Sequence, residues 1–300
     1  MVQTDKRWFG YLLVIIGATC WGVGGTVTQW LFQKAHLPVG EFVAIRLILS
    51  GVLLLIVSYF INGRSMMYIW SHKSSVVKIL IYGLLGMLGV QFTFMSAIKH
   101  GNAAVATLLQ YLGPIVIILY YVMRKKATFK RKEAIAILLA LSGTFLLLTN
   151  GQLDNLSVPM PAIIWGLISA IALAFYTIYP VPLLAQWGSL SVVGWAMLIG
   201  GIGLSFIYPP WHMDYLSWSM MTIICFMISI VFGTMIAFWF YIESLNYISP
   251  QEAGLLGTIE PLMAILTSVL WLHVSFGIFQ MVGVLCIIMM VVYLSIADSK

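Results

Sequence analysis

Charged side chains are scarce in this sequence. Asp, Glu, Lys and Arg make up 8% of its 300 residues, and 62% are hydrophobic. An ordinary soluble domain carries roughly 25% charged residues. Many apolar runs also reach the roughly 20 residues with which a helix crosses a bilayer. The composition therefore excludes a soluble protein and predicts an all-α integral membrane protein.

Cysteine, aspartate and the common catalytic motifs are scarce or absent too. The chain has only Cys20, Cys225 and Cys286, at unrelated spacings, which excludes a disulfide framework or a CxxC metal site. All four aspartates lie in loops or tails, and the five histidines are scattered. No H-E-x-x-H motif, phosphate loop or nucleophile elbow occurs. We therefore expect no enzyme, no catalytic residue, no metal and no cofactor.

Ten apolar segments joined by short loops account for nearly the whole chain. The predicted spans are Trp8–Leu31, Val39–Ile61, Ser75–Ile98, Ala103–Met123, Lys132–Thr149, Ala162–Ala185, Ser191–Tyr208, Ser219–Tyr247, Gln251–Trp271 and Phe276–Ala297. No linker is long enough to hold a soluble domain.

The basic residues predict how these spans are oriented. With ten spans, twelve Lys and Arg residues fall on one side of the membrane, and Lys34 and Lys99 fall on the other. Cytoplasmic loops carry such an excess. We therefore expect both termini in the cytoplasm of a multi-pass plasma membrane protein. This topology also explains the net charge of +6, so no nucleic acid partner is expected.

Two of the predicted spans resemble each other. When Ala103–Met123 is shifted by 147 residues onto Gln251–Trp271, several apolar residues coincide, and Pro114 falls on Pro261. The proline match is informative because the chain has only ten prolines. A proline inside a span removes a backbone hydrogen bond, and we expect each to act as a hinge beside a cavity.

The match divides the chain into residues 1–150 and 151–300, each with five spans. Because five is odd, the second half enters the membrane in the opposite direction. The predicted fold is thus two inverted five-helix repeats, which is a transporter layout that supports alternating access.

Several motifs resemble those of a known family. They are Trp21-Gly22 in the first span, Arg46 in the second, the paired prolines, and Gln280-Met281-Val282-Gly283-Val284 in the last. In these the chain is similar to the EamA-type ten-helix members of the drug/metabolite transporter superfamily. It departs from that family where Leu272-His273 replaces a frequent glycine–glutamate pair. The resemblance implies a central cavity and secondary transport of amino acids, other metabolites, amines or drugs, often outward.

The predicted cavity has polar and aromatic candidates. Trp21, Gln110, Tyr176 and Tyr179 lie on helical stripes with small residues or beside prolines, and we expect them to contact substrate. The small residues on these stripes are equally consistent with close helix packing alone.

Of the charged residues within spans, two are candidates for a functional role. Glu260 stands beside Pro261 near the middle of its span, and a carboxylate at that depth costs about 2.5 kcal/mol or more, so it marks function or a structural hydrogen bond. Arg46 could bind a substrate carboxylate with its planar fork. It could instead snorkel to the interface or pair with a carboxylate such as Glu41.

The sequence thus favours a secondary transporter that exports amino acids or related compounds through the lipid bilayer, with Glu260 as the carboxylate for substrate or a coupling proton. Two alternatives stay open. One is an uptake carrier for amines or nucleobase-like solutes. The other is a membrane protein that does not transport small molecules, such as a lipid scramblase or a sensor.

Overall fold

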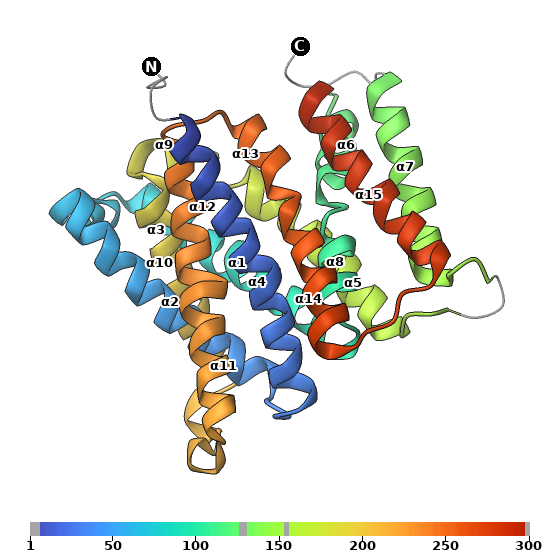
Figure 1. Cartoon of the computed structure of the whole chain (residues 1–300). Helices are drawn as coiled ribbons and strands as arrows, with labels where there is room; N and C mark the ends of the chain where they lie inside the picture. Colours follow the sequence, from blue (N-terminus) through green and yellow to red (C-terminus); the bar gives the residue numbers. More distant parts are fainter. Residues whose placement is uncertain (1–6, 126–130, 153–155, 298–300) are drawn as a thin grey trace.

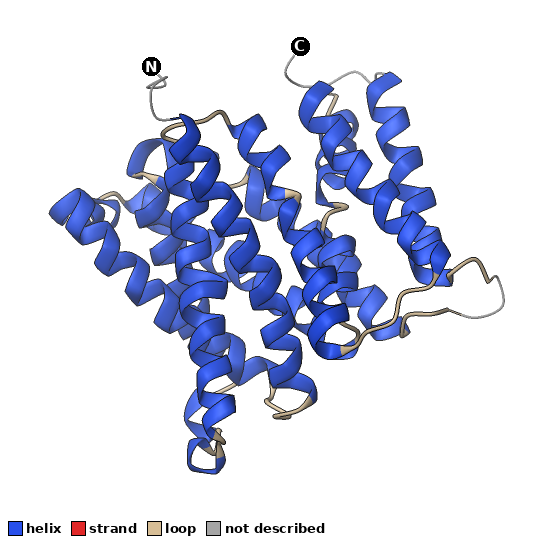
Figure 2. Cartoon of the chain, in the orientation of Figure 1, coloured by secondary structure: helices blue, strands red, loops and turns tan. Residues whose placement is uncertain are grey.

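The computed structural model describes residues 7–125, 131–152 and 156–297. In this part of the chain the regular structure is helical, and Figure 2 shows helices and loops but no strand. Nine helical segments there are long and apolar enough to cross a membrane, and Ser189–Ser205 is a shorter apolar helix. The prediction of an all-α membrane protein with ten spans is confirmed.

The spans follow in chain order. The first repeat contains α1 (Arg7–Gln33), α2 (Val39–Asn62), α3 with η3 and α4 (Lys73–Ile81, Tyr82–Met87, Leu88–His100), α5 with α6 (Ala103–Gln110, Gly113–Met123) and α7 (Arg131–Thr149). The second contains α8 (Met160–Ile178) with α9 (Val181–Trp187), α10 (Ser189–Ser205), α11 with η6 and α12 (Met220–Ile230, Val231–Ile236, Ala237–Ser244), α13 with α14 (Pro250–Gly257, Ile259–Leu272) and α15 (Ile278–Ala297). The 3-10 helices η2 (Gly63–Ser71), η4 (Pro210–His212) and η5 (Tyr215–Ser217) lie in the connections.

The two repeats pack against each other symmetrically. The first span of one repeat, α1, packs against α12 and α14, which belong to the third and fourth spans of the other. In the same way α8 packs against α4 and α5, while α2 pairs with α10 and α7 with α15. Figure 1 shows α1 beside α14, and α7 beside α15. The start of α1 and the end of α15 lie at the same end of the bundle, as an even number of spans requires.

The fourth and ninth spans are each broken next to their proline. In the fourth span the helix stops at Gln110 and resumes at Gly113, so that Pro114 lies in the first turn of α6. In the ninth span only Thr258 separates α13 from α14, and Pro261 lies in the first turn of α14. The breaks therefore occupy matching places in the two repeats.

The third and eighth spans contain π-helical turns that the sequence did not reveal. They are η3 and η6, and adding 149 to the residue numbers of the first gives those of the second. Such turns are rare and concentrate at functional sites. At the second turn, α1 approaches so closely that Gly24 faces Gly233 backbone to backbone. The repeat is therefore visible in the irregularities of the helices as well as in their order.

Three predicted spans end earlier in the structure. The sixth, predicted over Ala162–Ala185, ends at Ile178 and turns at Tyr179-Pro180 before α9 begins. The seventh, predicted to reach Tyr208, ends at Ser205, and the eighth ends at Ser244 instead of Tyr247. Pro180 lacks the backbone N–H that would continue α8, which explains the first difference.

Four of the basic residues behind the orientation prediction lie outside the described residues, namely Lys6, Lys126, Lys130 and Lys300. The orientation of the bundle relative to the cytoplasm therefore stays a prediction.

Candidate functional site

Glu260 lies in the first turn of α14, directly after the break at Thr258. The first helix of the opposite repeat packs closely against this turn, because a Cβ built on Gly22 of α1 would collide with the Glu260 carbonyl oxygen and with Met263. Thr26, one turn further along α1, is hydrogen-bonded to Thr267 of α14 at 2.7 Å. The carboxylate thus stands where α1 and the broken ninth span meet.

Tyr111 reaches this carboxylate from the other broken helix. It follows α5 at the interruption of the fourth span. Its hydroxyl donates to the Gly257 carbonyl oxygen at 2.9 Å and to Glu260 Oε2 at 3.2 Å. One side chain therefore joins the two breaks of the inverted repeats.

Further aromatic side chains surround the same point. The Trp21 ring of α1 lies 5.2 Å from the Tyr241 ring of α12, centroid to centroid. Tyr241 lies near both Glu260 and Tyr176 of α8, and a Cβ built on Gly257 would lie 3.9 Å from its ring. The Tyr176 ring in turn stacks on Tyr82 of η3 at 5.5 Å. We call these residues, Trp21, Tyr82, Tyr111, Tyr176, Tyr241 and Glu260, the Glu260 cluster.

The cluster combines one carboxylate with an aromatic wall. All its members except Tyr82 keep part of their surface accessible, although they lie among helices of both repeats. Among the described residues, the hydrogen bond to Glu260 comes from a phenol, and no Lys or Arg forms an ion pair with it. A carboxylate beside aromatic faces is suited to an organic cation, since the ring quadrupole also attracts positive charge.

Gln110 and Tyr179 flank this cluster. Gln110 precedes Tyr111, and its amide donates to the Ser169 hydroxyl of α8 at 2.7 Å. Tyr179 lies at the end of α8, where its ring stacks on Phe175 at 4.9 Å. The structure therefore gathers Trp21, Tyr176 and Glu260 and places these two residues at the edge of the group.

Arg46 lies elsewhere, buried against the π-helical turn η6. Its guanidinium donates to the Thr234 hydroxyl at 2.5 Å and to the Gly233 carbonyl oxygen at 3.1 Å. A third contact, also 3.1 Å, is to the Met95 sulfur. Glu41 is not among these partners. A π-turn departs from the regular hydrogen-bond pattern of an α-helix, and Arg46 donates to a carbonyl within it, so this arginine stabilises the irregular backbone of η6.

Glu252 also has a structural role. Its carboxylate accepts hydrogen bonds from Arg7 and from the Tyr11 hydroxyl, the second at 2.7 Å, and it closes a capping box with Ser249 at the start of α13. These contacts tie α1 to α13 at the end of the bundle where both termini lie. Glu260 has no such role at a helix cap.

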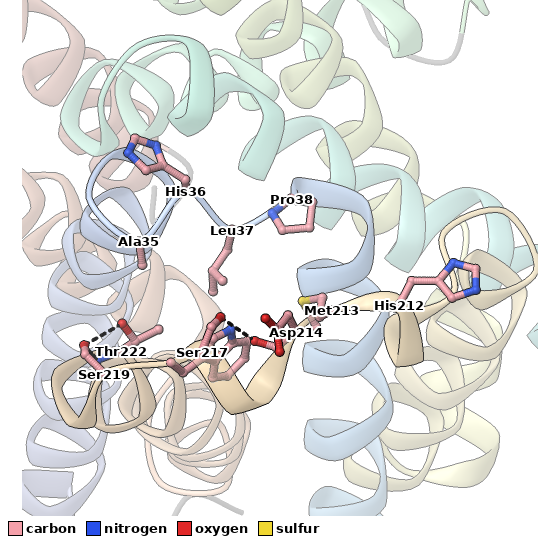
Figure 3. A pocket seen from close by; sticks show the side chains of 11 residues that line it. Ala35, His36, Leu37, Pro38, His212, Met213, Asp214, Ser217, Ser219 and Thr222 are labelled. Carbon is pink, nitrogen blue, oxygen red and sulfur yellow. Dashed lines mark hydrogen bonds between the residues drawn. The ribbon is translucent and has the colours of Figure 1, made fainter.

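A separate pocket lies at the opposite end of the bundle. It has a volume of about 390 Å³ between the α1–α2 loop and the segment before α11. Figure 3 shows Leu37 and Pro38 on one side of it and Asp214 and Ser217 on the other, with the His212 ring directed away. No member of the Glu260 cluster lines this pocket.

Comparisons with known proteins agree with this architecture. The profile of the EamA-like transporter family matches residues 8–149 and again residues 160–296. The chain belongs to the EamA-like transporter family. One relative of this EamA-like transporter is an uncharacterised inner membrane transporter, YicL, of Salmonella typhimurium strain LT2. The two are 35% identical over 291 residues, which cover 97% of this chain and 96% of that protein.

The fold of this EamA-like transporter is also found in a solved crystal structure described only as a protein. The two share 14% sequence identity and a TM-score of 0.66, over 99% of each chain. At that identity the likeness concerns the fold alone.

Three members of the cluster in this EamA-like transporter escaped the sequence reasoning. Tyr82 and Tyr241 lie within predicted spans that look uniformly apolar, and Tyr111 lies near the middle of another. Only the position of Tyr111 carried a signal, because it lies three residues before Pro114, next to the predicted candidate Gln110.

Proposed function

We propose that this EamA-like transporter is a secondary transporter that exports amino acids or related ammonium compounds across the plasma membrane by alternating access. The observation that carries the substrate class is the Glu260 cluster, a carboxylate set among aromatic rings from both repeats. The substrate ammonium would pair with Glu260, and Trp21 and Tyr241 would contact its remaining surface.

The symmetry of the bundle supports the transport cycle. Each repeat contributes a first span that packs against the broken and π-turned spans of the other. Rocking one repeat against the other would expose the Glu260 cluster to one side of the membrane at a time. The breaks before Pro114 and Pro261 are the places at which we expect the helices to bend.

The proposed orientation gives the Figure 3 pocket a place in this cycle. If both termini face the cytoplasm, the pocket lies at the external end of the bundle. An exported compound would then leave through it. The plasma membrane location and the outward direction are parts of the same proposal.

A second candidate substrate is an amine that has no carboxylate. It is favoured by the contacts of Arg46, whose guanidinium is hydrogen-bonded to η6 and Met95. An amino acid needs donors for its carboxylate, and among the described contacts at the cluster only neutral donors such as Tyr111 are available. The two candidates therefore differ in whether the carboxylate contributes to affinity.

Counterflow in proteoliposomes tests the proposal. Purified full-length protein is loaded with one unlabelled amino acid, and uptake of the labelled compound is measured for a panel of amino acids and their decarboxylated amines. Saturable counterflow of amino acids supports the first candidate, and a preference for the amines supports the second. Movement of fluorescent lipid without counterflow would show a scramblase and overturn both.

A further inference from the structure

Pro261 leaves a backbone acceptor without its helical donor. In a regular helix the N–H of residue 261 would bind the carbonyl of residue 257, but proline has no N–H. The Tyr111 hydroxyl donates to that Gly257 carbonyl oxygen at 2.9 Å. At this depth an unsatisfied carbonyl costs several kcal/mol. Tyr111 thus supplies, from the fourth span, the hydrogen bond that the ninth span lacks.

The same hydroxyl has a competing acceptor. Tyr111 also donates to Glu260 Oε2 at 3.2 Å. A phenol has a single hydrogen to donate, so the two acceptors share it. A charged carboxylate is the stronger acceptor, because hydrogen bonds to ionised groups are roughly twice as strong as neutral ones. The state of Glu260 therefore decides how much of this hydrogen bond remains at Gly257.

We propose that Tyr111 is a positioning residue that couples the occupancy of Glu260 to the break in the ninth span. When Glu260 is charged and empty, it draws the Tyr111 hydrogen away from Gly257, and the break loses its donor. When Glu260 is protonated or paired with a substrate ammonium, its need for that hydrogen falls, and Tyr111 donates fully to Gly257. No covalent bond changes except those of the proton that binds or leaves Glu260.

In this arrangement Tyr111 donates to Gly257 both when Glu260 is protonated and when it is paired with substrate. It does so less when Glu260 is charged and empty. An exchanger needs that distinction, since its proton-loaded and substrate-loaded forms must cross and its empty form must not. The other titratable groups near Glu260 are tyrosines, namely Tyr241 of α12 and, beyond it, Tyr176 of α8, while α1 presents Gly22 there. The inference rests on the proposed function of Glu260, so its test has one arm that does not depend on transport.

The first arm is a double-mutant cycle on stability. Tyr111→Phe and Pro261→Ala are made singly and together in the full-length protein, and thermal unfolding is followed in detergent. Pro261→Ala restores a backbone N–H at position 261, so Gly257 no longer depends on Tyr111. We expect the fall in melting temperature caused by Tyr111→Phe to shrink by roughly half or more in the Pro261→Ala background.

Tyr121→Phe removes a phenol from the accessible side of α6 and serves as the matched control, with equal effects in both backgrounds. If Tyr111→Phe alone fails to fold and the double variant folds, the coupling is supported. Additive shifts, or a double variant that also fails to fold, would overturn the proposal.

The second arm measures coupling in proteoliposomes. Tyr111→Phe is expected to move substrate with a reduced dependence on the proton gradient, and the thermal shift caused by substrate measures its binding separately. If transport by Tyr111→Phe depends on the proton gradient as in the wild type, Tyr111 has only a structural role, and the inference is overturned. Failure of the proposed function is seen separately, as unchanged transport by Glu260→Gln.

Discussion

A close backbone contact between the repeats allows a prediction whose size follows from the structure. Where α1 crosses the π-turn η6, a Cβ built on Gly24 would lie 2.5 Å from the Gly233 Cα atom. Carbon atoms in contact are about 3.5–4.0 Å apart, so Gly24→Ala forces the two backbones apart by about 1 Å. Such overpacking costs about 1–3 kcal/mol, against about 1 kcal/mol gained from the better helix propensity of alanine.

The neighbouring residue provides the control. A Cβ on Gly25 would meet only the Ala103 Cβ atom, at an ordinary 3.5 Å. Gly25→Ala should therefore keep or raise the melting temperature in detergent, and Gly24→Ala should lower it relative to Gly25→Ala by an amount equivalent to about 1–3 kcal/mol. Counterflow should slow in the first variant and persist in the second. Equal melting temperatures would refute the close crossing of α1 and η6.

Three further predictions concern topology, the broken helices and the buried arginine. In a cysteine-free background, an impermeant thiol reagent applied to intact cells should label a cysteine at position 155 and spare one at position 299, and the reverse would show that the orientation is wrong. Pro114→Ala should alter transport kinetics more than the melting temperature, because a straight helix keeps its hydrogen bonds, whereas normal kinetics would remove this break from the mechanism. Arg46→Lys should lower the melting temperature, since each hydrogen bond lost from a charged donor is worth about 1.5–3 kcal/mol, and an unchanged melting temperature with weaker affinity for amino acids would instead place Arg46 at the substrate.

Much of the architecture could be predicted because it depends on local features of the chain. The spans follow from the length of the apolar segments. The breaks follow from Pro114 and Pro261, because a proline lacks the N–H of a helical hydrogen bond whatever surrounds it. Glu260 could also be predicted as a candidate, since a carboxylate at membrane depth is unfavourable in free energy unless protein or water surrounds it.

The remaining features depend on which helices meet. The π-turns η3 and η6 lie in apolar runs that read as regular helix, and only their packing against α8 or α1 shows why the extra residue is tolerated. Two of the three partners of Arg46 are 187 and 188 residues away in the chain, at Gly233 and Thr234. Helical periodicity could not place Tyr241 beside Trp21 either, because it describes one helix at a time.

The most direct test of the central claim is transport by Glu260→Gln in proteoliposomes over a range of pH. This variant keeps the shape of the side chain and removes its charge, and Glu243→Gln, at a carboxylate late in the eighth span and outside the cluster, is the matched control. We predict that Glu260→Gln is produced normally but loses proton-dependent or cation-dependent transport, while Glu243→Gln retains it. Unchanged rate, affinity and pH profile in Glu260→Gln would contradict the account and leave Glu260 as a structural hydrogen-bonding group.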